Sequence, residues 1–105
     1  MNVWFAVPSK RRLESTRPVF AEWARTGYKV AVMIDPGDPE PDVDMVIRAP
    51  YAGYSRSVNA LAHAILRHDG AAQWIVTGGD DTYPDRTKEA QDIAIECYEH
   101  FGKST

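Results

Sequence analysis

The sequence has little cysteine, no long apolar run and no excess of positive charge, and each absence excludes a class of protein. The one cysteine, Cys97, rules out a disulfide within the chain, and its apolar helical surroundings indicate a small core residue. No stretch of the sequence contains the roughly 18 consecutive apolar residues that a membrane-spanning helix needs. Residues 1–4 lack the basic and apolar regions of a secretory signal. We therefore predict a cytoplasmic protein without a membrane span.

The charge balance gives no reason to expect a nucleic-acid partner. The chain has 12 Lys and Arg against 15 Asp and Glu, a net charge of −3, so no basic face is evident. Its 105 residues fit one domain, residues 1–105, with a single core. The cluster Lys10-Arg11-Arg12 is short, and both a solvated loop and a phosphate-binding loop are compatible with it.

Apolar patterning predicts an alternation of strands and helices. Short runs rich in β-branched and aromatic residues indicate strands, and apolar residues spaced three and four apart indicate helices. The expected strands cover residues 3–7, 28–35, 42–48 and 74–76, and the expected helices cover residues 18–26, 55–69 and 87–101.

Capping residues predict where these helices begin and end. Thr16 or Arg17 should lie near the first N-cap, with Pro18 in the first turn, where its missing N–H does no harm. Gly27 should end that helix, and Ser55 should cap the next one. The apolar faces of the last two helices should comprise Val58, Leu61, Ala62, Ile65 and Leu66, and Ala90, Ile93, Ala94, Cys97 and Phe101.

This alternation predicts a three-layer α/β/α sandwich with a mainly parallel, four-stranded, Rossmann-like sheet. Right-handed crossovers and a central first strand give the strand order 3-2-1-4. Such a sheet has a switch point between its first and fourth strands, where ligands bind at the carboxyl ends. The loop at residues 8–12 and the segment at residues 79–81 would both lie there.

An acidic pair follows the last predicted strand. The apolar run of residues 73–77 ends in Gly78-Gly79, and Asp80 and Asp81 come next. Two neighbouring carboxylates repel each other unless a cation compensates them. Mg²⁺-type ions usually bind through one or two carboxylates together with substrate phosphates. The pair therefore suggests a metal–diphosphate site, although an Asp-rich turn after a strand accounts for the same residues.

Four segments together resemble the nucleotide-binding half of a GT-A glycosyltransferase of the family-2 type, which uses nucleotide-diphospho-sugars. They are Val7–Lys10 after the first strand, Asp35 at the end of the second, residues 53–60 with Arg56 and Asn59, and Gly79-Asp80-Asp81, which is similar to the DxD-type metal motif of that family. The Gly-x-Gly-x-x-Gly loop is absent, as it is in that family. The resemblance covers residues 3 to 85.

The resemblance implies a UDP-sugar donor held through Mn²⁺ or Mg²⁺. It makes Asp81 the first metal ligand and Asp80 the second, the latter also reaching the ribose or a metal-bound water. The other nucleotide-binding residues that it implies are Pro8, Lys10, Arg11, Asp35, Arg56 and Asn59. Each of the polar ones also has a simpler explanation. Asp35 can begin a turn, Arg56 and Asn59 can be solvated or capping residues, and the two basic residues can serve solubility.

The sequence also departs from that family. Gly79 stands where the first Asp of the DxD motif would be, and the acceptor half with its catalytic base is missing, so no catalytic residue is assigned. A truncated or split relative, or a subunit that requires a partner, would account for this.

Two alternatives follow. One is a non-catalytic α/β interaction or oligomerisation protein, with a second copy or a partner subunit covering the edge of strand 74–76. The other is a flavodoxin-like phosphate-handling enzyme that uses Mg²⁺, with strand order 2-1-3-4.

Overall fold

The computed structural model describes residues 2–70, 72–84, 89–92 and 95. Its strands are β1 (Asn2–Pro8), β2 (Lys29–Ile34), β3 (Met45–Arg48) and β4 (Ala72–Thr77), and its helices are α1 (Leu13–Arg25) and α2 (Tyr54–His68). All strand pairs are parallel and the sheet order is β3-β2-β1-β4. This confirms the predicted order 3-2-1-4 and excludes the flavodoxin-like order 2-1-3-4.

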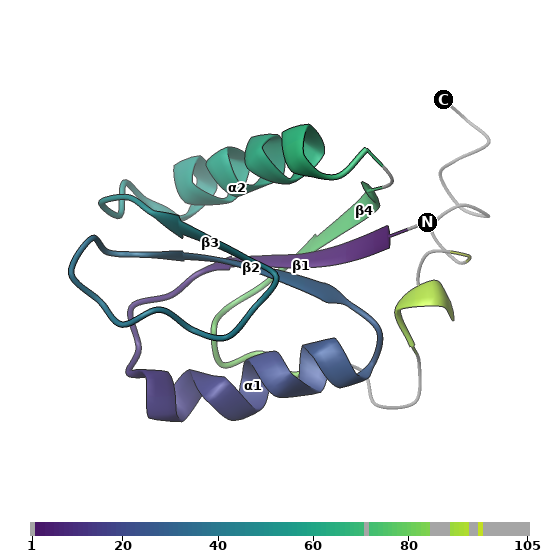
Figure 1. The fold of residues 1–105 in the computed structure, drawn as a ribbon, viewed down its shortest axis with the longest axis horizontal. Helices are drawn as coiled ribbons and strands as arrows, with labels where there is room; N and C mark the ends of the chain where they lie inside the picture. Colours follow the sequence, from purple (N-terminus) through teal and green to yellow (C-terminus); the bar gives the residue numbers. More distant parts are fainter. Residues whose placement is uncertain (1, 71, 85–88, 93–94, 96–105) are drawn as a thin grey trace.

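The two helices cover opposite faces of the sheet, as Figure 1 shows. Side chains of β1 alternate between them. Val3, Phe5 and Val7 pack in the core cluster that contains α1, whereas Trp4 and Ala6 pack in the cluster that contains α2. Because β1 and β2 are covered on both sides, their sequences read as continuous apolar runs.

The first helix begins earlier than its sequence predicts. Its N-cap is Arg12, not Thr16 or Arg17, and Pro18 lies inside the helix. Proline has no backbone N–H, so the helix lacks the hydrogen bond that residue 18 would otherwise donate to the carbonyl of Glu14. Burial outweighs that loss, because Leu13 is half-buried and Thr16 is fully buried on the face that also carries Phe20. The helix therefore begins five residues before the proline, and its first turns already carry buried side chains.

The C-terminus of α1 has the predicted glycine. Gly27 adopts a φ of 98°, the N–H of Tyr28 donates to the carbonyl of Trp23 at 3.1 Å, and that of Gly27 donates to Ala24 at 3.1 Å. These two bonds make a Schellman motif, and the rings of Tyr28 and Trp23 supply its apolar contact. The motif turns the chain directly into β2.

We expect Gly27→Ala to lower the free energy of unfolding by about 1–2 kcal/mol, because a Cβ is strained at this φ. Gly37→Ala is the matched control, since Gly37 does not have a positive φ and an added Cβ would meet nothing within 4 Å. Urea denaturation of both variants measures the difference. Equal midpoints for the two variants would contradict the assigned role of Gly27.

The second helix differs from its prediction in two respects. Its N-cap is Gly53 rather than Ser55, and Leu66 is 57% exposed instead of lying on the buried face. The buried residues of this helix are Ser57 and the predicted core residues Leu61 and Ile65. The pattern of apolar residues did not fully predict the buried face of this helix, because the orientation of the helix on the sheet decides which side chains are covered.

Strand β3 is shorter than expected, since residues 42–44 are not in the strand. At this position the side chain of Asp44, instead of a strand carbonyl, accepts a hydrogen bond from the N–H of Val30 in β2, at 2.8 Å. Of the helix predicted at 87–101, residues 90–92 and 95 are helical, with Ala90 buried. The rest of that prediction, including Ile93, Ala94, Cys97 and Phe101, lies outside the described residues.

Candidate functional site

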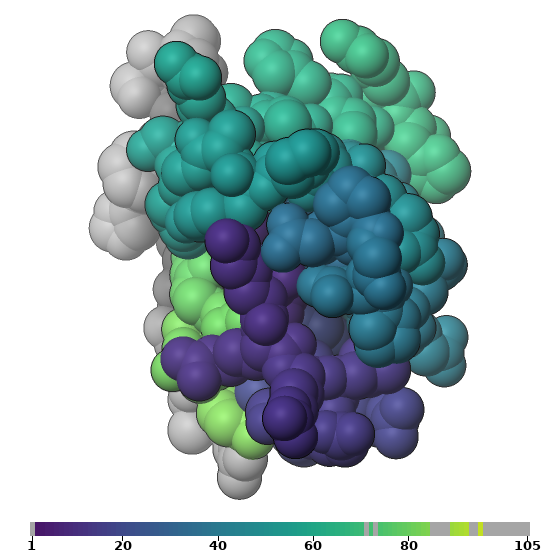
Figure 2. All heavy atoms as spheres, turned by 90° about the vertical axis from the view of Figure 1, so that its left-hand side faces the viewer, coloured from purple at the N-terminus to yellow at the C-terminus, as the bar shows by residue number. Residues whose placement is uncertain are grey.

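The carboxyl ends of all four strands meet at one edge of the molecule, because the sheet is parallel. Figure 2 looks onto this face, with the β1–α1 loop (purple) in its middle, between the loop after β2 (blue) and the loop after β4 (green). The switch point between β1 and β4 therefore lies at the centre of the face, where ligands bind in sheets of this kind.

The two predicted acidic residues lie in a tight turn directly after β4. We call residues 79–82 the acidic turn. The N–H of Thr82 donates to the carbonyl of Gly79 at 3.1 Å, and the N–H of Gly79 donates to the hydroxyl of Thr82 at 3.1 Å. From α1, Nε1 of Trp23 donates to the carbonyl of Thr82 at 2.7 Å. The carboxylates are thus carried by a turn that is bonded internally and anchored to a helix.

Both oxygens of Asp80 are engaged by the β1–α1 loop. Oγ of Ser9 donates to Oδ2 at 2.9 Å, and Nε of Arg11 donates to Oδ1 at 2.8 Å. A second guanidinium nitrogen of Arg11 lies 3.3 Å from Oδ2 of Asp81. The hydrogen bond to Asp80, and then the charges of Asp80 and Asp81, raise the pKa of the Arg11 guanidinium above its ordinary value. Arg11 therefore supplies the positive charge that the acidic pair requires.

The two carboxylates differ in their exposure. The side chain of Asp80 is 12% exposed, whereas that of Asp81 is 66% exposed. A Cβ on Gly79 would lie 2.8 Å from Oδ1 of Asp81. The glycine therefore lets this carboxylate fold close over the backbone of the turn.

The acidic turn carries oxygen atoms of the kind that hard divalent cations prefer. Within the part of the chain that the structure describes, no three His, Cys, Asp or Glu side chains are grouped to hold a metal ion. Two carboxylates and the hydroxyl of Ser9 are oxygen donors, and Mg²⁺-type ions commonly take one or two carboxylates with substrate phosphates. The guanidinium of Arg11 already forms ion pairs with both carboxylates, those of Asp80 and Asp81.

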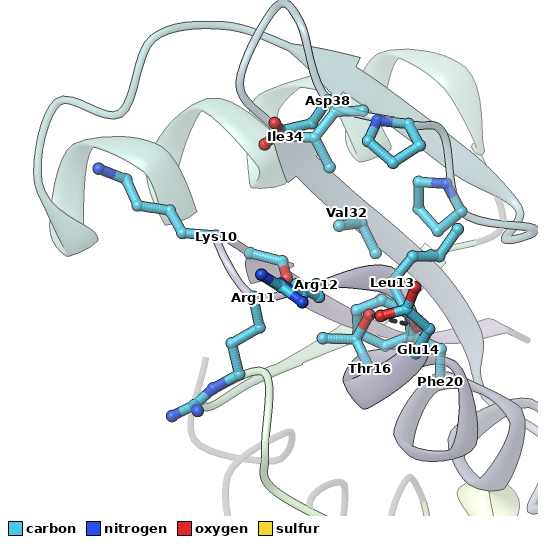
Figure 3. Close-up of a pocket in the computed structure, with 13 residues that line it drawn as sticks. Lys10, Arg11, Arg12, Leu13, Glu14, Thr16, Phe20, Val32, Ile34 and Asp38 are labelled. Atoms are coloured by element: carbon cyan, nitrogen blue, oxygen red, sulfur yellow. Dashed lines mark hydrogen bonds between the residues drawn. The ribbon is translucent and has the colours of Figure 1, made fainter.

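A pocket of about 230 Å³ adjoins the acidic turn. Its apolar wall is formed by Phe20, Val32 and Ile34, and charged side chains stand at its rim (Figure 3). The lining comprises Ser9, Lys10, Arg11, Arg12, Leu13, Glu14, Thr16, Phe20, Val32, Ile34, Asp38, Pro39 and Pro41. Ser9 and Arg11 thus belong both to this pocket and to the hydrogen-bond network of the acidic turn.

The loop after β2 forms the outer wall of the pocket and is held by Arg48. One guanidinium nitrogen of Arg48 donates to the carbonyl of Asp38 at 2.8 Å, and another lies 3.4 Å from a carboxylate oxygen of Glu40. The N–H of Asp38 donates to the carbonyl of Asp35 at 3.1 Å. As a result Asp38 lines the pocket, and Asp35, the first residue after β2, does not.

Three other predicted residues lie outside the pocket wall. Pro8 is the last residue of β1 and pairs with Met33. Arg56 and Asn59 are exposed on the first turns of α2. They share the carboxyl-end side of the sheet with Asp80 and Asp81, but they do not line the pocket.

Two tyrosines connect the surrounding loops to this face. Nζ of Lys10 lies 4.4 Å from the ring centroid of Tyr51, and in Figure 3 the Lys10 side chain points away from the pocket. The hydroxyl of Tyr54 lies 2.7 Å from Oγ1 of Thr77, which ties the start of α2 to the end of β4.

Sequence reasoning did not assign Ser9, Thr16 or Asp38 to a site. The available signal was their position: Ser9 directly follows β1, Thr16 lies early in α1, and Asp38 lies in the loop after β2.

No protein-family model, no curated protein and no solved structure matches this sequence. The resemblance to GT-A glycosyltransferases therefore rests on the residues alone. None of the helices in the described residues is long and apolar enough to cross a membrane. Among the described strands β4 is an edge strand paired with β1; its covering by a second copy or a partner stays a prediction.

Proposed function

We propose that this domain binds a nucleoside diphosphate sugar, with a UDP-sugar as the expected donor, together with Mn²⁺ or Mg²⁺. It would act as the donor-binding part of a GT-A-like glycosyltransferase. The observation that carries the proposal is that the pocket and the acidic turn share Ser9 and Arg11. A ring system held in the pocket would bring an attached diphosphate next to Asp80 and Asp81.

The size of the pocket favours one ring system over a whole nucleotide-sugar. Its volume of about 230 Å³ is below the roughly 300–1,000 Å³ that encloses a drug-sized ligand. The apolar wall of Phe20, Val32 and Ile34 suits the faces of a base or a pentose. The carboxylates of Glu14 and Asp38 line the same pocket and can accept hydrogen bonds from ring N–H or hydroxyl groups. The phosphates and the sugar would then extend over the open face shown in Figure 2.

The charges explain why a metal ion belongs to the proposal. A diphosphate at the acidic turn would lie next to the carboxylates of Asp80 and Asp81. Their negative charges would repel those of the phosphates. A bound divalent cation would supply positive charge against the diphosphate and against the negative charge of a departing nucleotide. From the protein side, Asp81 and Asp80 would hold that ion. Lys10 and Arg11 line the pocket, and they would reach phosphate oxygens by turning from Tyr51 and Asp80.

Calorimetric titration of UDP with and without Mn²⁺ tests the proposal. We expect affinity to rise at least about tenfold when Mn²⁺ is present, the effect of about 1.4 kcal/mol of added binding energy. Uridine and inorganic pyrophosphate are the matched control ligands. Uridine should bind independently of Mn²⁺ and pyrophosphate should depend on it, because each addresses one half of the site. No metal-dependent binding at millimolar UDP would overturn the proposal.

A further inference from the structure

The first turn of α2, residues 54–57, carries polar groups that the proposed donor site does not use. The helix begins at Tyr54, and its N-cap residue Gly53 has no side chain that could bond the N–H groups of the turn. We infer that this turn, together with the hydroxyl of Ser57, binds a phosphoryl group through hydrogen bonds and without a metal ion. The inference goes beyond the proposed function, because it requires neither a nucleotide nor the acidic turn.

Three backbone N–H groups of the turn have no acceptor among the described residues, those of Tyr54, Ser55 and Arg56. The bonding of the helix starts one residue later, where the N–H of Ser57 donates to the carbonyl of Gly53 at 3.1 Å. The first turn of α2 also contains no acidic residue, whereas the first turn of α1 contains one. The positive end of the α2 dipole is therefore not compensated by a side chain, and such an end attracts an anion.

The hydroxyl of Ser57 is a fourth group that lacks a partner in the described part of the chain. The residue is 2% exposed, and its Oγ makes no hydrogen bond. Nearly all buried polar groups in proteins have a partner, and leaving one without a partner destabilises the fold. Side chains of an α-helix lean toward its N-terminus, so this hydroxyl points back over the first turn. An oxygen atom bound there would supply the acceptor that the hydroxyl lacks.

The charges around the turn favour a phosphoryl group over a carboxylate. Arg56 is exposed in the turn itself, and Nζ of Lys10 lies 4.4 Å from the ring centroid of Tyr51, in the segment just before the helix. A phosphoryl group carries about 1.5 to 2 negative charges at pH 7 and three strong acceptor oxygens. Its oxygens can therefore accept from several N–H groups and the hydroxyl at once, while the two cations balance its charge.

The test titrates inorganic phosphate into the ¹⁵N-labelled full chain, with EDTA present to remove metal ions. We expect saturable changes at millimolar phosphate in the backbone amide signals of residues 54–57. Sodium chloride at equal ionic strength and sodium acetate are the control salts, and both should change these signals less. Absence of a saturable change at residues 54–57 would overturn the inference, and so would a change confined to residues 10–13, which would place the anion on the basic loop.

Ser57→Ala distinguishes a phosphate ligand from a hydroxyl that is merely buried. We expect the variant to bind phosphate about fivefold more weakly, because one hydrogen bond is lost. Its thermal unfolding temperature without phosphate should rise, because an unpaired polar group is removed from the interior. Opposite changes in affinity and stability support the inference. A folded variant with unchanged phosphate affinity overturns it.

Ser55→Asp tests the position of the anion. The new carboxylate lies in the first turn of α2, where it stabilises the helix but repels phosphate, and we expect at least about tenfold weaker binding. Ser15→Asp is the matched control, since it adds the same charge to an exposed serine in the first turn of α1. It should leave the affinity almost unchanged, and a larger effect of Ser15→Asp than of Ser55→Asp overturns the inference. Because these titrations contain no metal ion, a failure of Mn²⁺-dependent UDP binding overturns the proposed function alone.

Discussion

Replacing Trp23 by alanine is expected to lower the free energy of unfolding by about 3–5 kcal/mol. The indole is 5% exposed and stacks on Phe5, with ring centroids 3.9 Å apart and planes inclined by 5°. Its other neighbour, Tyr28, meets it edge to face at 4.7 Å. Truncation would leave a cavity between α1 and the central strand, which the surrounding rings cannot fill without moving.

Trp23→Phe is the control that separates packing from hydrogen bonding. It keeps an aromatic ring against Phe5 but loses the Nε1 bond to the carbonyl of Thr82, and we expect a loss of about 1–2 kcal/mol. Urea denaturation followed by tryptophan fluorescence and circular dichroism gives both values. An alanine variant within about 1 kcal/mol of the unchanged protein would show that Trp23 is not a core anchor.

Removing the carboxylate of Asp81 is expected to abolish the metal dependence of UDP binding, a loss of at least about tenfold in affinity at saturating Mn²⁺, which is the whole gain expected from the ion. The side chain is 66% exposed, so Asp81→Ala should leave the stability of the fold almost unchanged. Calorimetry with UDP measures the affinity and thermal unfolding measures the stability. Asp42→Ala removes an equally charged, exposed side chain near α1, away from the acidic turn, and should alter neither property.

Asp80→Ala should affect both binding and stability. It removes the metal-binding carboxylate and also leaves Ser9 and Arg11 without the acceptor that joins the β1–α1 loop to the acidic turn. If Asp81→Ala binds UDP with undiminished Mn²⁺ dependence, Asp81 does not belong to the site. The same result for both variants would show that the ion binds elsewhere.

Local sequence predicted the elements whose signals are local. The β-branched and aromatic runs of β1 and β2 and the left-handed Gly27 appear in the structure as expected. The strand order also followed, because right-handed crossovers leave few arrangements. Predictions failed where packing outweighs a local rule. Pro18 indicated a helix start, but the burial of Thr16 sets the start of α1 at Leu13.

The candidate site divides in the same way. The sequence by itself determined which chemical groups follow the strands: a basic loop after β1 and an acidic pair after β4. Only the tertiary structure decided that Arg11 pairs with Asp80, 69 residues away, and that Asp38 rather than Asp35 lines the pocket. The physical reason is that such pairings depend on the register of β1 against β4 and on the bonds of Arg48 to the loop after β2. These contacts exist only once the sheet is assembled, and no short stretch of sequence encodes them.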